Sequence, residues 1–185
     1  EVVEAVRQHW PAHKPLFLRL SVDDDVGWDP DQSSRLAALV KPKGVDVIDC
    51  SSGGMRGAPV ASATPVTYGY QVPYATKIRR EAGIMTMAVG LIIHADQAEQ
   101  ILRTGQADLV ALGRELLHNP NWPVDAAEKL GVGRLGYGQL PRSYGYWLEK
   151  RAGTNYGGRP STWQVGIGDT ASAAPARIAA SEGLR

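Results

Sequence analysis

The stretch that decides the fold is Ala107-Asp-Leu-Val-Ala-Leu-Gly-Arg-Glu-Leu-Leu-His-Asn-Pro120. Its apolar run, Leu109 to Leu112, is too short for a helix and is bounded by polar residues, so it predicts a buried parallel strand. Gly113 and Arg114 follow, and the next residues begin a helix. A glycine at such a junction leaves backbone N–H groups accessible to an anion, and Arg114 adds a cation. The stretch predicts either a phosphate site or an ordinary strand-to-helix turn with a surface arginine, and by itself favours neither.

The same strand-then-helix unit recurs along the chain. Short apolar runs predict strands at residues 16–21, 45–50, 85–89 and 109–112. Apolar residues at helical spacing predict helices at residues 1–10, 74–82 and 95–104, with two more that start at the N-cap pair Asp29-Pro30 and at Trp122. This repeated alternation implies a parallel sheet that is covered by helices.

A parallel sheet of this size has two architectures open to it. Four units make half of an eight-stranded (β/α)8 barrel, or a small open sheet. A half barrel by itself leaves two unpaired edges and a wet inner face. The helical pattern is already under way at Glu1, which suggests a missing N-terminal part. We therefore expect this α/β chain to supply the second half of a TIM barrel.

Composition narrows the class of protein. The 185 residues carry a net charge of +1, so neither nucleic acid nor a membrane surface is an expected partner. No apolar run approaches membrane-spanning length. The single cysteine, Cys50, rules out a disulfide framework and fits a reducing, cytoplasmic compartment. Cys50, Met85 and Met87 are expected in the core, and we identify no pattern of metal ligands.

Alternation in the first strand gives Arg19 a direction. Leu16, Leu18 and Leu20 share one face, which should lie against the helices, so Arg19 should point towards the barrel axis near the rim where active sites lie. A charge there needs a partner, because an unpaired buried ion is costly. The partner is either a strand carboxylate, such as Asp46 or Asp49, or an anionic cofactor or substrate, and we favour the second.

Five motifs then come in the order and spacing of one known family. They are Phe17-Leu-Arg-Leu-Ser21, Gly44-Val-Asp-Val-Ile-Asp-Cys-Ser-Ser-Gly53, Gly69-Tyr-Gln-Val-Pro73, Ala88-Val-Gly90 and the stretch from Ala107 to Leu117. Over residues 1–151 the chain resembles the C-terminal half of the Old Yellow Enzyme family of flavin ene-reductases, in its bacterial thermophilic-like and xenobiotic-reductase branch. The resemblance implies an FMN-binding TIM barrel of which this chain supplies strands five to eight. Residues 152–185 lack the pattern and are rich in Gly, Ala and Ser, so we expect little order there.

The resemblance also assigns cofactor-binding residues. Arg19 would lie against the N1 and C2 carbonyl edge of the flavin, where a cation favours the anionic reduced form. The FMN phosphate would be held by Gly90, the N–H of Leu91, Gly113 and Arg114. Ser51 would lie near the flavin, although a small residue at a strand end with no ligand contact is the alternative. The implied reaction passes hydride from NADPH or NADH to FMN, and then to the β-carbon of a small activated alkene such as an enone.

The family's other active-site residues have no counterpart in this sequence. Its substrate-orienting pair, two histidines or a histidine and an asparagine, and its proton-donating tyrosine belong to the N-terminal half, so we identify no catalytic residue here. Among the four histidines, His94 is the one expected near the rim. The complete site therefore needs an N-terminal half-barrel chain or segment. Arg142, Tyr144 and Trp147 match a segment that contacts a neighbouring subunit in this branch, which suggests a homo- or hetero-oligomer; a local aromatic patch is the alternative.

Other functions remain compatible with these residues. The chain could be a non-catalytic half-barrel that binds FMN or another phosphate ligand and acts only with a partner chain. It could also belong to a different phosphate-binding barrel enzyme that uses the same rim.

Overall fold

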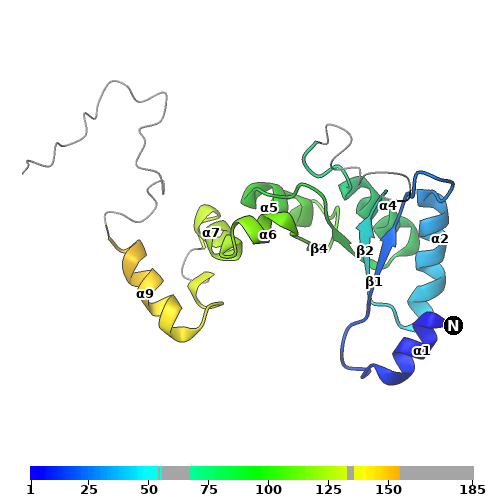
Figure 1. Ribbon diagram of the computed structural model, residues 1–185, viewed down its shortest axis with the longest axis horizontal. Helices are drawn as coiled ribbons and strands as arrows, with labels where there is room; N and C mark the ends of the chain where they lie inside the picture. Colours follow the sequence, from blue (N-terminus) through cyan, green and yellow to red (C-terminus); the bar gives the residue numbers. More distant parts are fainter. Residues whose placement is uncertain (54, 56–66, 133–135, 155–185) are drawn as a thin grey trace, which may run out of the picture. The chain divides into compact units, whose positions relative to one another are not determined.

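Four parallel strands form one sheet in the computed structural model, which describes residues 1–53, 55, 67–132 and 136–154. The strands are β1 (Phe17–Ser21), β2 (Val47–Ser51), β3 (Met85–Ala88) and β4 (Leu109–Val110), and they lie side by side in chain order (Figure 1). Their order and direction confirm the predicted parallel α/β fold. In the register, Arg19 lies opposite Asp49, and Asp49 opposite Met87.

The last strand is shorter than predicted. The apolar run to Leu112 forms a strand only over Leu109–Val110, although the N–H of Ala111 still donates to the carbonyl of Ala88 at 2.8 Å. The reason lies in its partner: β3 ends at Ala88, which pairs with Val110, so the ladder has no partner strand beyond that point.

Helices follow the strands as the sequence predicts. They are α1 (Val2–His9), α2 (Pro30–Val40), the 3-10 turn η1 (Lys41–Lys43), α4 (Val72–Ala82), α5 (Ala95–Arg103), α6 (Arg114–His118), α7 (Trp122–Lys129) and α9 (Arg142–Ala152). The start of α2 is the predicted one. Asp29 caps it by accepting from the N–H of Gln32, Gln32 accepts in return from the N–H of Asp29, and Pro30 occupies the first turn. Helix α4 begins two residues earlier than expected, with Pro73 in its first turn.

One face of the sheet is the core. Leu18, Leu20, Ile48, Cys50 and Ala88 alternate along the strands and belong to one apolar cluster with residues of α2, α4 and α5. Cys50 is fully buried, as predicted. Burial of each of the larger side chains on this face stabilises the folded chain by about 1.5–3 kcal/mol, so this face contributes most to holding the sheet and helices together.

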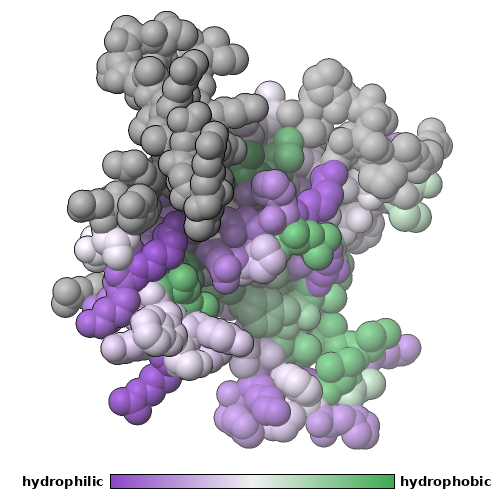
Figure 2. All heavy atoms as spheres, turned by 60° about the vertical axis from the view of Figure 1, so that its left-hand side comes forward, coloured by the Kyte–Doolittle hydropathy of each residue, from purple (hydrophilic) through white to green (hydrophobic). Residues whose placement is uncertain are grey.

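The other face of the sheet, here called the open face, is only partly covered among the described residues: Val47 on β2 is buried, whereas apolar side chains on the other three strands are not. Phe17, Met85 and Leu109 lie on it and are 43%, 49% and 36% exposed. Met85 and Met87 were both expected in the core, but they lie on this face and neither belongs to the buried core, so that prediction was wrong, because composition does not tell which face of a strand a helix covers. Apolar side chains also reach the surface between polar ones elsewhere (Figure 2), and Leu117 on α6 is 83% exposed.

Two compact units divide the chain, Glu1–Leu140 and Pro141–Arg185. The first holds the sheet and its helices, and the second contains α9. The tail predicted at residues 152–185 lies, from residue 155 onward, outside the described residues. None of the described helices is both long enough and apolar enough to cross a membrane.

Candidate functional site

The carboxyl ends of the strands border one cavity of about 550 Å³. That volume is within the range of small-molecule and cofactor sites. All six residues that the sequence analysis selected line this cavity: Arg19, Ser51, Gly90, Leu91, Gly113 and Arg114. They come from four separate segments, and they meet because parallel strands bring their carboxyl ends to the same edge of the sheet.

Arg19 projects from the face opposite Leu18 and Leu20, as predicted. Those two leucines pack against the core, whereas Arg19 lines the cavity and its side chain is 56% exposed. Its Nη1 donates to Asp49 Oδ2 at 2.7 Å, and its Nη2 donates to Ser51 Oγ at 3.1 Å. Arg19 therefore pairs with a strand carboxylate, the first of the two predicted partners, and also faces a cavity; an anionic ligand at this arginine stays a prediction.

The turn after β3 forms a second side of the cavity. Gly90 has φ +112°, and a Cβ there would lie 2.6 Å from Gln71 Nε2, so only glycine fits. Leu91 has φ +48°, a strained conformation for a residue with a side chain. Its carbonyl accepts from Gln97 Nε2 at 2.9 Å and from the N–H of Gly69 at 3.3 Å, which holds the strained turn in place.

Gln71 is a site residue that the sequence analysis did not select. It is 3% exposed and lines the cavity. Its Oε1 accepts from Ser52 Oγ at 2.7 Å and its Nε2 donates to the carbonyl of Val89 at 3.2 Å, so it ties the loop after β2 to the end of β3. A signal was present, since Gln71 lies in the Gly69–Pro73 motif, but nothing in the sequence placed that motif beside Gly90.

Gly113 and Arg114 supply the third side. Within the described residues, no acceptor pairs with the N–H groups of Gly90, Leu91 or Gly113, so these donors are available to a ligand. A Cβ on Gly113 would meet nothing within 4 Å. Arg114 forms no ion pair with another described residue. Helix α6 has only five residues, so attraction for an anion depends on these N–H groups and on Arg114 more than on a helix dipole.

The histidines are placed differently from the prediction. His118, at the end of α6, lines the cavity, whereas His94 is not among its lining residues. His94 occupies the N-cap of α5 and packs edge-on against Tyr68, with ring centroids 5.1 Å apart. The short length of α6 explains the difference, because its last residue stays close to the turn at Gly113.

Cys50 lies beside this site but on the core face of β2. Burial, and then the neighbouring Asp49 carboxylate, raise the pKa of the Cys50 thiol to about 12. A thiol with that pKa is almost entirely protonated at neutral pH, and protonated thiols are poor nucleophiles. Cys50 is therefore a packing residue.

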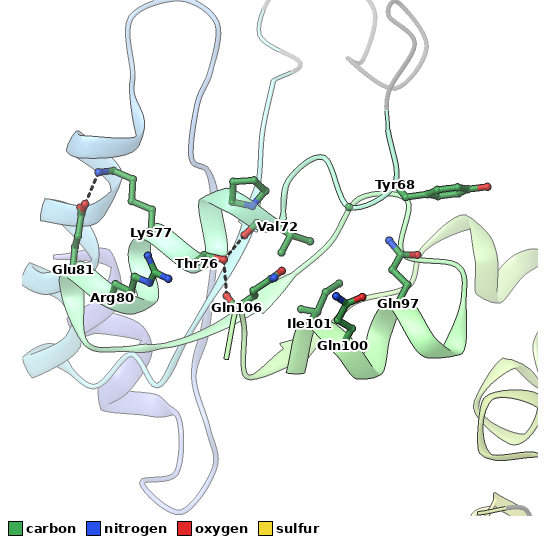
Figure 3. A pocket seen from close by; sticks show the side chains of 12 residues that line it. Tyr68, Val72, Thr76, Lys77, Arg80, Glu81, Gln97, Gln100, Ile101 and Gln106 are labelled. Atoms are coloured by element: carbon green, nitrogen blue, oxygen red, sulfur yellow. Dashed lines mark hydrogen bonds and ion pairs between the residues drawn. The ribbon is translucent and has the colours of Figure 1, made fainter. Parts of the chain in front are cut away.

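A second cavity, of about 710 Å³, lies between α4 and α5 and shares no residue with the first (Figure 3). On its wall, the Thr76 hydroxyl lies 3.1 Å from the carbonyl oxygens of Val72 and Gln106, and either of them can accept its single proton. Lys77 pairs with Glu81 at 2.5 Å and with Asp31 at 2.7 Å, so its charge is already compensated. None of the six selected residues lies there.

The fold and the first cavity together define a class of protein. A parallel α/β sheet with glycine turns, free N–H groups and two arginines at its carboxyl edge is typical of a domain that binds a phosphate-bearing cofactor. The sequence matches the NADH:flavin oxidoreductase / NADH oxidase family over residues 1–132, and the chain belongs to that family. The cofactors of this family are FMN and a reduced nicotinamide nucleotide.

Curated relatives include several bacterial enzymes named NADPH dehydrogenase. The one from Geobacillus thermodenitrificans is 50% identical over 137 residues, which cover 71% of this chain and 38% of the relative. Those from Halalkalibacterium halodurans and Listeria monocytogenes (serotype 4a) are 43% and 42% identical over 146 residues, which cover 78% of this chain and 41% of each relative. The chain thus spans about two fifths of the length of these relatives.

Proposed function

We propose that this chain is the FMN-binding half of an NAD(P)H-dependent oxidoreductase of Old Yellow Enzyme type, in its bacterial branch, that reduces activated C=C bonds such as those of enones. In this proposal the four strands are strands five to eight of a TIM barrel. The observation that carries the proposal is the meeting of Arg19, Ser51, Gly90, Leu91, Gly113 and Arg114 around one cavity.

The residues of the cavity fit FMN. The open space at Gly113 and the turn at Gly90 leave room for a phosphate close to the backbone, next to unpaired N–H groups and Arg114. Arg19, held from a different strand, would place a cation at the pyrimidine edge of the flavin, and Ser51 would orient that cation. When bound, FMN would supply the group that takes up and gives out the hydride.

A partner would complete this site. We propose that an N-terminal half-barrel, as a chain or a segment, covers the open sheet face with Phe17, Met85 and Leu109 and supplies the groups that bind the alkene. Exposed aromatic residues on α9, Tyr144 at 65% and Trp147 at 69%, support a further contact with a second subunit, in which Arg142 would take part. The single buried cysteine supports a cytoplasmic location.

The test is a fluorescence titration of the purified chain with FMN and, separately, with riboflavin, which lacks the phosphate. Arg114→Ala should weaken FMN binding at least roughly tenfold, because a hydrogen bond to a charged group contributes about 1.5–3 kcal/mol. Riboflavin binding should change little in that variant. Arg80→Ala is the matched control, since Arg80 is an exposed arginine that lines the second cavity and not the first.

Two results would contradict the proposal. The wild-type chain could show no binding of FMN at micromolar concentrations of protein and ligand. Alternatively, Arg114→Ala and Arg80→Ala could weaken FMN and riboflavin binding to the same extent.

A further inference from the structure

We propose that Asp49 is a positioning residue that acts on the flavin through Arg19, fixing the guanidinium and lowering the positive charge that the flavin experiences. This inference rests on the proposed FMN site. Arg19 and Asp49 are direct neighbours in the parallel register of β1 and β2, so their side chains leave the same face of the sheet. The distance from Arg19 Nη1 to Asp49 Oδ2 is 2.7 Å.

Asp49 reaches the cavity only through its partner. It is 7% exposed and is not among the residues that line the cavity, whereas Arg19 and Ser51 both line it. Asp49 and Ser51 accept from different terminal nitrogens of Arg19, which fixes the plane of the guanidinium group. An arginine has five N–H donors, so this arrangement leaves others free to face the cavity.

The pairing of Asp49 with Arg19 is exclusive within the described residues. Its Oδ1 is buried and accepts no hydrogen bond from any of them, so its charge is compensated through Oδ2 alone. A buried carboxylate without a partner is strongly unfavourable. Asp49 and Arg19 therefore fix each other's position and compensate each other's charge. Removing the charge of either residue leaves the charge of the other uncompensated.

The other candidate partner, Asp46, is occupied elsewhere. It accepts from Arg7 Nη2 at 2.8 Å and from the N–H of Leu16 at 2.7 Å, so it secures α1 and the entry to β1. Asp46 thus provides a matched control: an aspartate at the same strand pair, bound to an arginine, but at the end of the sheet away from the cavity.

The pair has a consequence for electron transfer. Reduction adds negative charge to the flavin, and a cation at its pyrimidine edge favours that state, whereas a carboxylate behind the cation opposes it. Asp49→Asn keeps the shape and an acceptor oxygen for Arg19 but removes the charge. It should favour reduced FMN by about tenfold in the redox equilibrium constant, a rise of about 30 mV for a two-electron couple.

The experiment measures the midpoint potential of FMN bound to the full chain and to four variants. Asp49→Asn should raise the potential, and Asp46→Asn should leave it unchanged. Asp49→Glu, which retains the charge but shifts the carboxylate, should stay close to the wild-type potential and keeps the comparison usable if the asparagine variant does not fold. Asp49→Ala should weaken FMN binding, because Arg19 is then held only by Ser51.

A second measurement needs no FMN. In the ligand-free chain, NMR signals of the Arg19 guanidinium should report slow rotation that becomes fast in Asp49→Ala. Equal potentials for the wild type and Asp49→Asn, or unchanged Arg19 signals in Asp49→Ala, would overturn the inference. If the wild-type chain binds no FMN, the proposed function itself fails, and the redox role of Asp49 fails with it.

Discussion

At the scale of single residues, two glycines in the site are there for different reasons. Gly90 has φ +112° and lies against Gln71 and Tyr70, so the fold itself requires it. Gly113 has φ −96° and open space around its missing side chain, so there the space belongs to the cavity. One glycine therefore supports the shape of the turn, and the other keeps room for a ligand.

A matched pair of substitutions tests this difference. Gly90→Ala should lower the free energy of unfolding by roughly 1–3 kcal/mol, because it adds both backbone strain and a close contact with Gln71. Gly113→Ala should lower it by less than about 1 kcal/mol and should instead weaken FMN binding. Urea unfolding of both variants, followed by circular dichroism, measures the effect. Equal losses of stability would show that the turn at Gly90 is not specially constrained.

The residue-level predictions succeeded where they depended on alternation along one strand. They failed where they depended on which residues of separate elements lie close together. Period-two alternation placed Arg19 on the cavity side, because successive strand side chains must point to opposite faces. Alternation says nothing about neighbouring strands, so it could not decide whether Arg19 pairs with Asp46 or Asp49. His118 was missed for a similar reason: only the observed length of α6 shows that its end remains beside the cavity.

At the scale of elements, Asp108 joins the strands to the helices at the end of the sheet away from the cavity. It accepts from Arg79 on α4 at about 3.0 Å and from the N–H of Thr86 on β3 at 2.9 Å. Burial by itself would raise the pKa of Asp108, but the hydrogen bonds from Arg79 and Thr86 outweigh it and hold this pKa below its ordinary value. The contacts thus favour the ionised carboxylate in the folded chain.

This lowered pKa makes the contribution of Asp108 to stability dependent on pH. The contribution is fully present above the ordinary pKa, near 3.8, and is lost as the pH falls through the lower pKa of the folded state. Asp108→Asn should therefore lower the free energy of unfolding at pH 7 by roughly 1–3 kcal/mol. The difference in the free energy of unfolding between Asp108→Asn and wild type should become smaller below about pH 4.

Urea unfolding at a series of pH values measures this dependence. Glu99→Gln is the control, because the one ion pair of Glu99 with a described residue is an exposed pair with Arg103, at 3.7 Å, and such pairs contribute little. A constant gap between Asp108→Asn and wild type from pH 7 to pH 3 would contradict the prediction.

Element boundaries illustrate what the sequence could decide and what it could not. The start of α2 was predictable, since its capping box is local chemistry between Asp29 and Gln32. The end of β4 was not, because the length of a strand depends on its partner, and β3 ends at Ala88, opposite Val110. Met85 was misplaced for the same reason: its environment depends on what covers the open face.

At the scale of the whole molecule, two observations support the proposed half-barrel role: the open sheet face and the length of the relatives. Phe17, Met85 and Leu109 are apolar and partly exposed on a face that a closed barrel would cover. The chain spans only 38% of the Geobacillus thermodenitrificans relative. We therefore expect the complete active site to need polypeptide beyond these 185 residues.

The last prediction follows: this chain, by itself, should not reduce cyclohexenone at the rate of a complete enzyme. Hydride transfer needs the alkene held in position, which can account for roughly 7–11 kcal/mol of barrier reduction. Proton delivery adds roughly 10²–10⁴-fold. The residues to which these roles are assigned by resemblance have no counterpart here, and the open sheet face leaves the site accessible to water, which weakens every electrostatic interaction in it.

The assay compares NADPH-dependent product formation by the chain alone with formation after co-expression with the unmatched part of the Geobacillus thermodenitrificans relative. The chain alone should be at least roughly 10²-fold slower, since general acid catalysis alone is worth that much. Arg114→Ala should reduce the gain on co-expression, because FMN would then be bound at least roughly tenfold more weakly. Rapid turnover by the monodisperse chain would show that these residues already contain a complete catalytic site. FMN binding with no activity in either preparation would favour a non-catalytic, cofactor-binding half-barrel, because the cavity would then hold the cofactor without positioning a substrate.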